Sequence, residues 1–312
     1  MSTLFMFPGQ GSQSPGMLSR LPDTQETAQT LAESTEVLGQ EPQGLETPEA
    51  LRSTVAVQLC LLIAGVAMAR NLIARGVQPR MVTGMSIGAF PAAVVAGILD
   101  YRDALRLVSI RAQAMEQAFP SGHGMTAVIG LDIRRLDSLV HSVNAEELPV
   151  FIANINAERQ LIVSGCDAGM ERVTELAMQQ GASRCERLDV AVPSHCPLLE
   201  PVAVTMRAAM RETPLSRPRI AYLSCSAART LADPERIRED LASNVARQVN
   251  WPDTIRLAWE LGTRLAVEMP ARDVLCRLSQ ESFQDGGIVI ASEGRSPDSI
   301  ATLADAQARR MS

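Results

Sequence analysis

One stretch of the chain, residues 80–97 (RMVTGMSIGAFPAAVVAG), combines a short apolar strand, a turn bounded by glycines and an Ala/Val-rich helix. In the turn, Ser86 lies two residues after Gly84 and two residues before Gly88. This G-x-S-x-G pattern at a strand–helix junction is typical of a sharp turn that lifts a serine hydroxyl clear of the backbone. The free N–H groups at the start of the next helix can stabilise a negatively charged oxygen. The pattern therefore predicts a nucleophilic Ser86, with an ordinary tight turn as the alternative.

Strands and helices alternate on both sides of this stretch. Residues 4–7 predict a short strand that ends in the turn-rich segment PGQGSQ at residues 8–13. Helical periodicity covers residues 24–38, 48–75 and 100–119. Alternation of this kind indicates a parallel, doubly wound α/β core.

The pattern changes after residue 122. The order of predicted elements becomes β-α-β-β-α-β, which is the split βαβ or ferredoxin-like arrangement. We therefore predict a small ferredoxin-like domain at residues 123–190, inserted into a large hydrolase-like α/β domain with a parallel sheet core formed by residues 1–122 and 191–312. The expected elements of the insert are strands at 124–131, 150–156, 160–164 and 185–190 and helices at 133–143 and 168–180. After it come helices at 197–211, 234–247 and 252–261 and strands at 220–224 and 264–268.

Composition excludes several classes of function. The chain has 312 residues, a net charge of −6 and 46% hydrophobic residues, which is ample for a packed core. The acidic balance and the lack of any basic cluster argue against a nucleic-acid partner. All 29 residues of the Lys+Arg count are arginine. Without lysine, Schiff-base enzymes, pyridoxal enzymes and P-loop phosphate sites are excluded.

Cysteine usage and hydropathy predict a cytoplasmic location. The six cysteines are scattered, without C-x-x-C or zinc-site spacing, so we expect no metal and a reducing compartment. The N-terminal residues lack the charged region of a signal peptide. The longest apolar run, residues 53–69, is slightly short for a membrane span and includes Gln58, so we expect a buried helix and no membrane association.

A serine nucleophile needs a base, and the chain has three histidines, His123, His141 and His195. The first two lie in the predicted insert, where surface positions are expected. His195 lies in a loop directly after the insert, and it is either the base of a Ser86–His195 dyad or a solvated loop residue. A serine hydrolase orders its triad Ser, acid, His, and this order alone does not exclude that class.

Arg111 lies on an amphipathic helix beside apolar residues, which leaves two interpretations. Its side chain either extends along the surface to water, or it is buried and binds a carboxylate with two parallel hydrogen bonds. Together with the insert, it speaks against the common serine hydrolases.

Four motifs now stand in a fixed order: FPGQGSQ at residues 7–13, GMSIG at 84–88, Arg111, and VPSH at 192–195. This order resembles malonyl-CoA:acyl carrier protein transacylases, and the similarity extends from Leu4 to about Leu278. The resemblance implies that Ser86 is the acylated nucleophile, His195 its base, and Arg111 the group that holds the malonyl carboxylate. Among the other implied site residues, Gln10 and Ile87 supply backbone N–H groups to the oxyanion hole, the backbone carbonyl of Gln248 orients the histidine, and Asn154 and Asn156 form part of the pocket wall.

The resemblance implies malonyl-CoA as substrate and an acyl carrier protein as partner, without a metal or other cofactor. The chain departs from the usual G-H-S-x-G-E elbow, because Met85 and Ala89 stand at the His and Glu positions. A Ser-Ile-Gly-Ala-Phe elbow is similar to the transacylase (epsilon) subunit of malonate decarboxylases, so we expect that branch, with the other decarboxylase subunits as further partners. The alternatives are the same reaction in fatty-acid or polyketide synthesis, a serine esterase or thioesterase, and a catalytically silent binding subunit.

Overall fold

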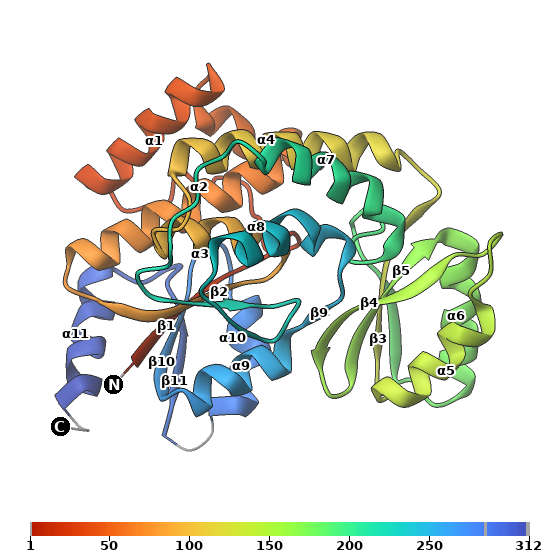
Figure 1. Cartoon of the computed structure of the whole chain (residues 1–312). Coiled ribbons are helices and arrows are strands. Elements are labelled where there is room, and N and C mark those ends of the chain that lie inside the picture. Colours follow the sequence, from red (N-terminus) through yellow and green to blue (C-terminus); the bar gives the residue numbers. More distant parts are fainter. Residues whose placement is uncertain (1, 284–285, 310–312) are drawn as a thin grey trace.

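The computed structural model describes residues 2–283 and 286–309, which form two sheets in two lobes (Figure 1). The larger sheet has the strand order β11-β10-β1-β2-β7-β8. Its neighbouring strands are parallel except for β8, which is antiparallel to β7. This mixed α/β core confirms the predicted parallel sheet. Its strands are β1 (Ser2–Phe7), β2 (Pro79–Gly84), β7 (Ala221–Ser224), β8 (Arg229–Leu231), β10 (Thr263–Glu268) and β11 (Ile288–Ala291).

Strand β1 is buried on both faces because helices cover both sides of the large sheet. Phe5 and Phe7 pack into the larger apolar cluster, and Leu4 and Met6 pack into a second cluster on the other face. Alternating side chains of a strand point to opposite faces, so a continuous apolar run is what a doubly covered strand requires. The helices on the first side are α1 (Gln25–Leu38), α2 (Thr54–Ala74), α3 (Ala89–Val95), α4 (Tyr101–Ala118), α7 (Glu200–Met210), α8 (Pro234–Ser243) and α11 (Pro297–Arg309). Those on the second are α9 (Trp251–Glu260) and α10 (Val274–Ser279).

Helix α2 is the central helix of the large lobe. Its N-cap, Ser53, accepts hydrogen bonds from the backbone N–H groups of Val55 and Ala56. The helix is long and apolar enough to cross a membrane, but 89% of its most apolar window is buried inside the protein. The sequence prediction of a buried helix is therefore confirmed.

The smaller sheet has the strand order β6-β3-β5-β4-β9. The predicted order β-α-β-β-α-β is present, and strands β6, β3, β5 and β4 pair antiparallel in that order. A fifth strand from the large lobe, β9 (Val249–Asn250), adds in parallel to β4 and was not predicted, because two residues carry no periodic signal. The other elements are β3 (His123–Ile129), α5 (Ile133–Val143), β4 (Val150–Ala157), β5 (Gln160–Cys166), α6 (Asp167–Gln179) and β6 (Arg184–Arg187).

The small sheet buries one face and leaves the other toward the large lobe. Helices α5 and α6 pack on the first face around Val128, Leu161 and Val163. Met125, Ala127, Ala153 and Ile162 form a separate small cluster on the second face. Figure 1 shows this second face turned toward the large lobe. The small sheet therefore presents these apolar side chains, together with polar ones such as Asn154 and Asn156, to the region between the lobes.

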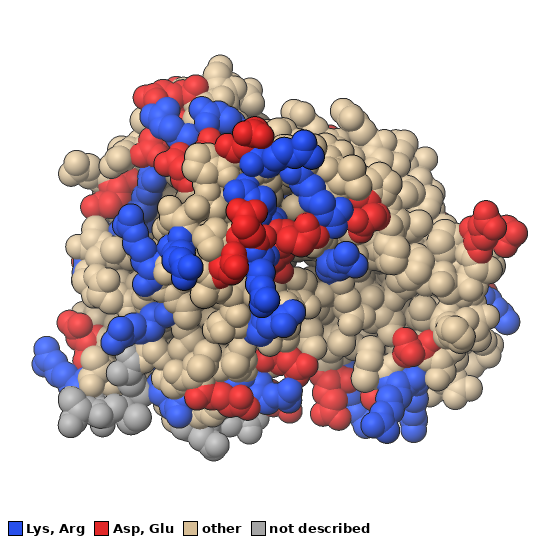
Figure 2. Space-filling view, in the orientation of Figure 1, with Lys and Arg blue, Asp and Glu red and all other residues tan. Residues whose placement is uncertain are grey.

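The charged side chains, the cysteines and the potential metal ligands are distributed over the molecule as follows. On the face drawn in Figure 2, acidic and arginine side chains are interspersed over the large lobe. All six cysteines are described, and each is a free thiol. Within residues 2–283 and 286–309, no group of His, Cys, Asp or Glu side chains is placed to hold a metal ion.

Candidate active site

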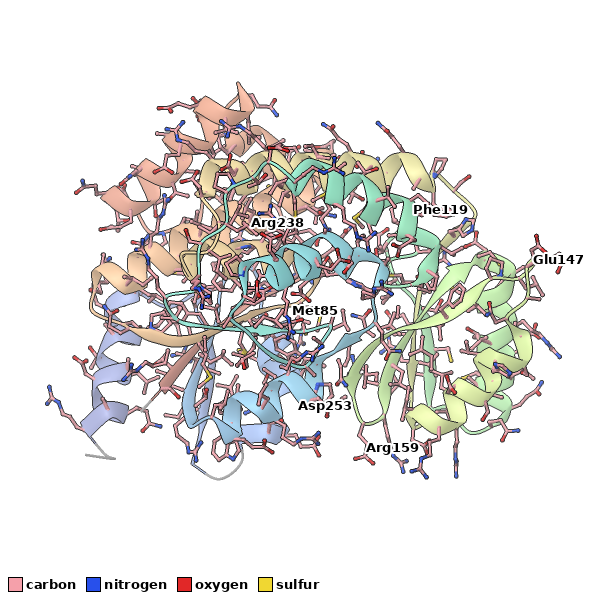
Figure 3. All side chains as sticks on the ribbon, in the orientation of Figure 1. Met85, Phe119, Glu147, Arg159, Arg238 and Asp253 are labelled. Atoms are coloured by element: carbon pink, nitrogen blue, oxygen red, sulfur yellow. The ribbon has the colours of Figure 1, made fainter. Side chains whose placement is uncertain are left out.

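Ser86 lies at the turn between β2 and α3, in a short 3₁₀ helix, Ser86–Gly88, that leads into α3. Its φ of +55° is in the left-handed region, which residues other than glycine seldom occupy. Such a conformation persists only where its surroundings fix it, and it is frequent at functional sites. Figure 3 labels the preceding residue, Met85, on the side of the large lobe that faces the small lobe.

Two backbone approaches fix this turn. A Cβ atom on Gly84 would lie 2.0 Å from the carbonyl carbon and oxygen of Gly88. A Cβ atom on Gly88 would lie 2.1 Å from the carbonyl oxygen of Phe7. The G-x-S-x-G pattern is therefore required sterically, because the turn presses on its own backbone and on the end of β1. The turn is therefore tight, and the role of Ser86 as a nucleophile stays a prediction.

Ser86 and His195 lie on the walls of the same cleft, which has a volume of about 280 Å³. The loop after β1, the open face of the small sheet and helix α10 complete the walls. The lining includes Gln10, Met85, Met125, Asn154, Asn156 and Leu275. The cleft is therefore small. It brings together Ser86 and His195, which are far apart in the sequence, as the sequence analysis expected.

His195 is held as a neutral imidazole. Its Nδ1 atom lies 2.8 Å from the carbonyl oxygen of Asn244 and 3.1 Å from that of Arg247. Because a carbonyl oxygen only accepts hydrogen bonds, Nδ1 carries the proton and Nε2 is left with its lone pair. Burial, helped by the nearby charge of Arg111, lowers the pKa of His195 to about 4. The ring is thus buried and neutral at pH 7, with the Nε2 lone pair free to accept a proton, and it is not a solvated loop residue.

The prediction for Gln248 is wrong, because the carbonyls of Asn244 and Arg247 orient the histidine. The chain forms a 3₁₀ turn at Asn244–Ala246, and this turn directs the carbonyls on its two sides toward the histidine loop. Gln248 has a different contact: its Nε2 atom donates to the carbonyl oxygen of Ile152 on β4, at 2.9 Å. It therefore joins the large lobe to the small sheet.

Arg111 is fully buried, so the surface interpretation is wrong. Its guanidinium donates to Gln58 Oε1 at 2.7 Å, to Ser86 Oγ at 3.2 Å and to Asn244 Oδ1 at 3.3 Å, while Nε has no partner. Within the described ranges, no carboxylate lies within ion-pair distance of it. Burial lowers the pKa of Arg111 to about 9, so the side chain stays mainly charged at pH 7. A buried cation with neutral partners is suited to bind an anion beside Ser86.

The remaining predicted residues lie around the same place. Gln10 lines the cleft, and Ile87 follows Ser86 with its side chain in the core. Asn154 and Asn156 also line the cleft, and the Oδ1 atom of each is buried without a hydrogen-bond partner. Their assigned roles, like the Ser86–His195 dyad, stay predictions.

Sequence reasoning missed two residues that contact Arg111, namely Gln58 and Asn244. Gln58 gave a usable signal, because it is a polar residue inside the longest apolar run and is 1% exposed in the structure. A buried polar side chain needs a partner, and this one donates to Met115 Sδ as well as accepting from Arg111. Asn244 gave no local signal.

Comparison with known proteins decides the family. The acyl transferase domain family matches residues 4–308. The chain belongs to this family. It is 32% identical over 289 residues to the malonyl CoA-acyl carrier protein transacylase of Haemophilus influenzae, which covers 90% of this chain and 92% of that protein.

Solved structures agree with this acyltransferase assignment. The malonyl CoA-acyl carrier protein transacylase of Coxiella burnetii superposes with a TM-score of 0.92 and 29% identity, covering 98% of this chain and 97% of that one. A malonyl-transacylase solved in complex with its type II polyketide synthase acyl-carrier protein superposes with a TM-score of 0.90 and 30% identity, covering 98% and 100%.

The close backbone approaches at the Ser86 turn predict that adding a Cβ atom there lowers the stability of the fold. Gly88→Ala places a methyl group against the backbone of β1, so we expect a loss of at least about 1–3 kcal/mol in the free energy of unfolding. Gly44→Ala is the matched control, because nothing lies within 4 Å of a Cβ atom there. Thermal unfolding of both variants measures the difference. Equal melting temperatures for the two variants would show that the turn yields without cost.

Proposed function

We propose that this acyltransferase moves a malonyl group from malonyl-CoA to the prosthetic-group thiol of an acyl carrier protein, through a malonyl-serine intermediate. The observation that carries the proposal is the fully buried guanidinium of Arg111, which lies 3.2 Å from Ser86 Oγ and has only neutral partners. A malonyl thioester brings a carboxylate close to its reacting carbonyl, so one acyl group can meet both the nucleophile and the cation. The names of the relatives support the same reaction.

Fatty-acid or polyketide synthesis is the better-supported role for this reaction. The relatives over nearly the whole chain are named as carrier-protein transacylases, and one was solved with a polyketide synthase carrier protein. The assignment to the malonate decarboxylase branch rested on the Ser-Ile-Gly-Ala-Phe elbow alone. The comparisons favour the synthetic role over that branch. The partner that we propose is therefore an acyl carrier protein.

The proposed reaction has two half-reactions, and the same protein groups act in both. Ser86 Oγ bonds to the thioester carbonyl carbon while its proton passes to Nε2 of His195. The C–S bond then breaks, and the leaving sulfur takes the proton from His195. In the second half, the thiol of the carrier arm gives its proton to His195 and its sulfur bonds to the ester carbonyl carbon. The C–O bond to Ser86 then breaks, and Ser86 Oγ takes the proton back from His195. The N–H groups of Gln10 and Ile87 are the proposed donors to the oxyanion in both halves.

Arg111 contributes to this scheme in two ways. Ser86 Oγ accepts a hydrogen bond from Arg111 Nη2, so the hydroxyl proton is free to be donated elsewhere. Its Nε has no hydrogen-bond partner, and we propose that the carboxylate of the acyl group pairs with this buried charge. Binding that carboxylate selects the substrate and holds the acyl group while CoA leaves and the carrier arm enters.

The first test identifies the nucleophile. Incubation with malonyl-CoA and intact-protein mass spectrometry should detect a malonyl adduct on the parent chain and none on Ser86→Ala. Ser12→Ala is the control, because Ser12 also lines the cleft and should leave the adduct intact. A full-stoichiometry adduct on Ser86→Ala would place the nucleophile elsewhere. Rapid release of free malonate would indicate a thioesterase, and no adduct on the parent chain a silent subunit.

The second test concerns selection of the carboxylate. Arg111→Ala leaves a malonyl carboxylate without its partner but takes nothing from an acetyl group. We expect the transition-state stabilisation that kcat/KM measures for malonyl-CoA to fall by roughly 3–5 kcal/mol. We expect kcat/KM for acetyl-CoA to change little. Arg111→Lys should restore malonyl transfer only in part, because an ammonium group forms no planar fork. Arg106→Ala, an exposed position on the same helix, is the control. An equal fall for both substrates would make Arg111 structural.

The third test uses the pKa of the base. A histidine whose pKa is lowered to about 4 stays neutral as the pH falls through 6.5, the ordinary value. Because only the neutral ring accepts the serine proton, kcat/KM for malonyl-CoA should stay level from pH 8 to about pH 5 and fall as the pH nears 4. Initial rates across this range, with thermal unfolding followed at each pH, check the expectation. A half-maximal rate near pH 6.5 would contradict it.

A further inference from the structure

Asn244 contacts all three residues assigned to the reaction. Its side-chain Oδ1 accepts a hydrogen bond from Arg111 Nη2 at 3.3 Å, and its Nδ2 donates to the backbone carbonyl of Ser86 at 3.4 Å. Its backbone carbonyl accepts from Nδ1 of His195 at 2.8 Å. The residue is 6% exposed and lies in the turn that follows α8. Asn244 therefore contacts the proposed nucleophile, the proposed base and the buried cation at the same time.

The oxygen and the nitrogen of the Asn244 amide have different hydrogen-bonding roles. The oxygen faces a donor, and the nitrogen faces an acceptor, so the site needs a group that both accepts and donates. A carboxylate of the same shape would accept from Arg111 but would face the carbonyl of Ser86 with a second acceptor. It would also supply a fixed negative charge beside the guanidinium. An amide holds the guanidinium in place without cancelling its charge.

Gln58 supports this interpretation from the other side of the guanidinium. It also presents a neutral amide oxygen to Arg111, at 2.7 Å, and it is 1% exposed. Its own Nε2 donates to Met115 Sδ, so it has no bond to the Ser86 turn. Two neutral oxygens from distant parts of the chain thus accept hydrogen bonds from one buried cation. Of the two amides, only that of Asn244 is also bonded to Ser86, through its Nδ2 atom.

We propose that the Asn244 side chain is a positioning residue that fixes the Arg111 guanidinium relative to Ser86 and leaves its charge for the carboxylate of the acyl group. The inference rests on the proposed function, because it needs Arg111 to bind that carboxylate. It is separate from the support of His195, since a change of the side chain at position 244 leaves the backbone carbonyl that contacts the histidine in place.

The experiment measures the ratio of kcat/KM for malonyl-CoA to that for acetyl-CoA in Asn244→Ala and Asn244→Asp. Asn244→Ala removes a hydrogen bond to a charged group, so the ratio should fall about 10- to 100-fold. Asn244→Asp should lower the ratio further than the alanine variant, because its carboxylate pairs with Arg111 in place of the substrate. A side chain that served packing alone would give the opposite order, with the isosteric aspartate the milder change.

Matched variants complete the design. Gln58→Glu puts the same charge beside Arg111 without touching the Ser86 turn, and it should also lower the ratio. Gln180→Glu makes the identical change at an exposed position at the end of α6 and should leave the ratio unchanged. Thermal unfolding reports whether each variant folds, and Asn244→Ser replaces Asn244→Ala if the alanine variant does not.

The outcomes separate this inference from the proposed function. If Arg111→Ala lowers the ratio while both Asn244 variants stay within about threefold of the parent, the inference is overturned and the proposed function stands. The inference is also overturned if the aspartate variant is milder than the alanine variant. If Arg111→Ala leaves the ratio unchanged, the carboxylate assignment in the proposed function fails and the inference fails with it. The expected order, parent above alanine above aspartate, supports both.

Discussion

A buried arginine without an acidic partner is the constraint on which the centre of this molecule depends. Removing a guanidinium from water is costly, and here the compensation comes from neutral oxygens rather than from a carboxylate. Those oxygens belong to Gln58 on α2, to Ser86 in the turn after β2, and to Asn244 in the turn after α8. The packing of these elements against α4 is therefore coupled to the placement of one charge. The charge lies beside Ser86, because Arg111 Nη2 is 3.2 Å from Ser86 Oγ.

A few contacts between the two lobes lie close to the cleft and to His195. Among the contacts between the lobes are the two-residue strand β9 and the amide of Gln248, which donates to the carbonyl of Ile152 on β4. Both contacts follow directly on the turn that carries Asn244 and Arg247, whose carbonyls orient His195. One short segment thus contacts both the small sheet and His195. A narrow cleft of this kind suits a transferase, because an acyl-serine ester must be protected from water.

Local pattern was sufficient for most of the fold. The strand at residues 4–7, the turn around Ser86 and the helix at residues 133–143 were predicted because each depends on periodicity or on glycines within a few residues. The C-terminal elements α10, β11 and α11 were not predicted. Strand β11 is four residues long and all four are half-buried at the edge of the sheet, so it has no alternation of buried and exposed positions.

The sequence by itself predicted a sharp turn at Ser86, named His195 and Arg111 as candidates for one site, and showed that no lysine takes part. Only the tertiary structure decided that Asn244 and Arg247, rather than Gln248, orient the histidine, and that Arg111 is buried among neutral partners. The physical reason is that a strand, a helix or a tight turn is fixed by nearby residues, whereas a hydrogen-bond partner is fixed by where distant segments meet. Asn244 and Ser86 meet because α8 and β2 pack in the same lobe.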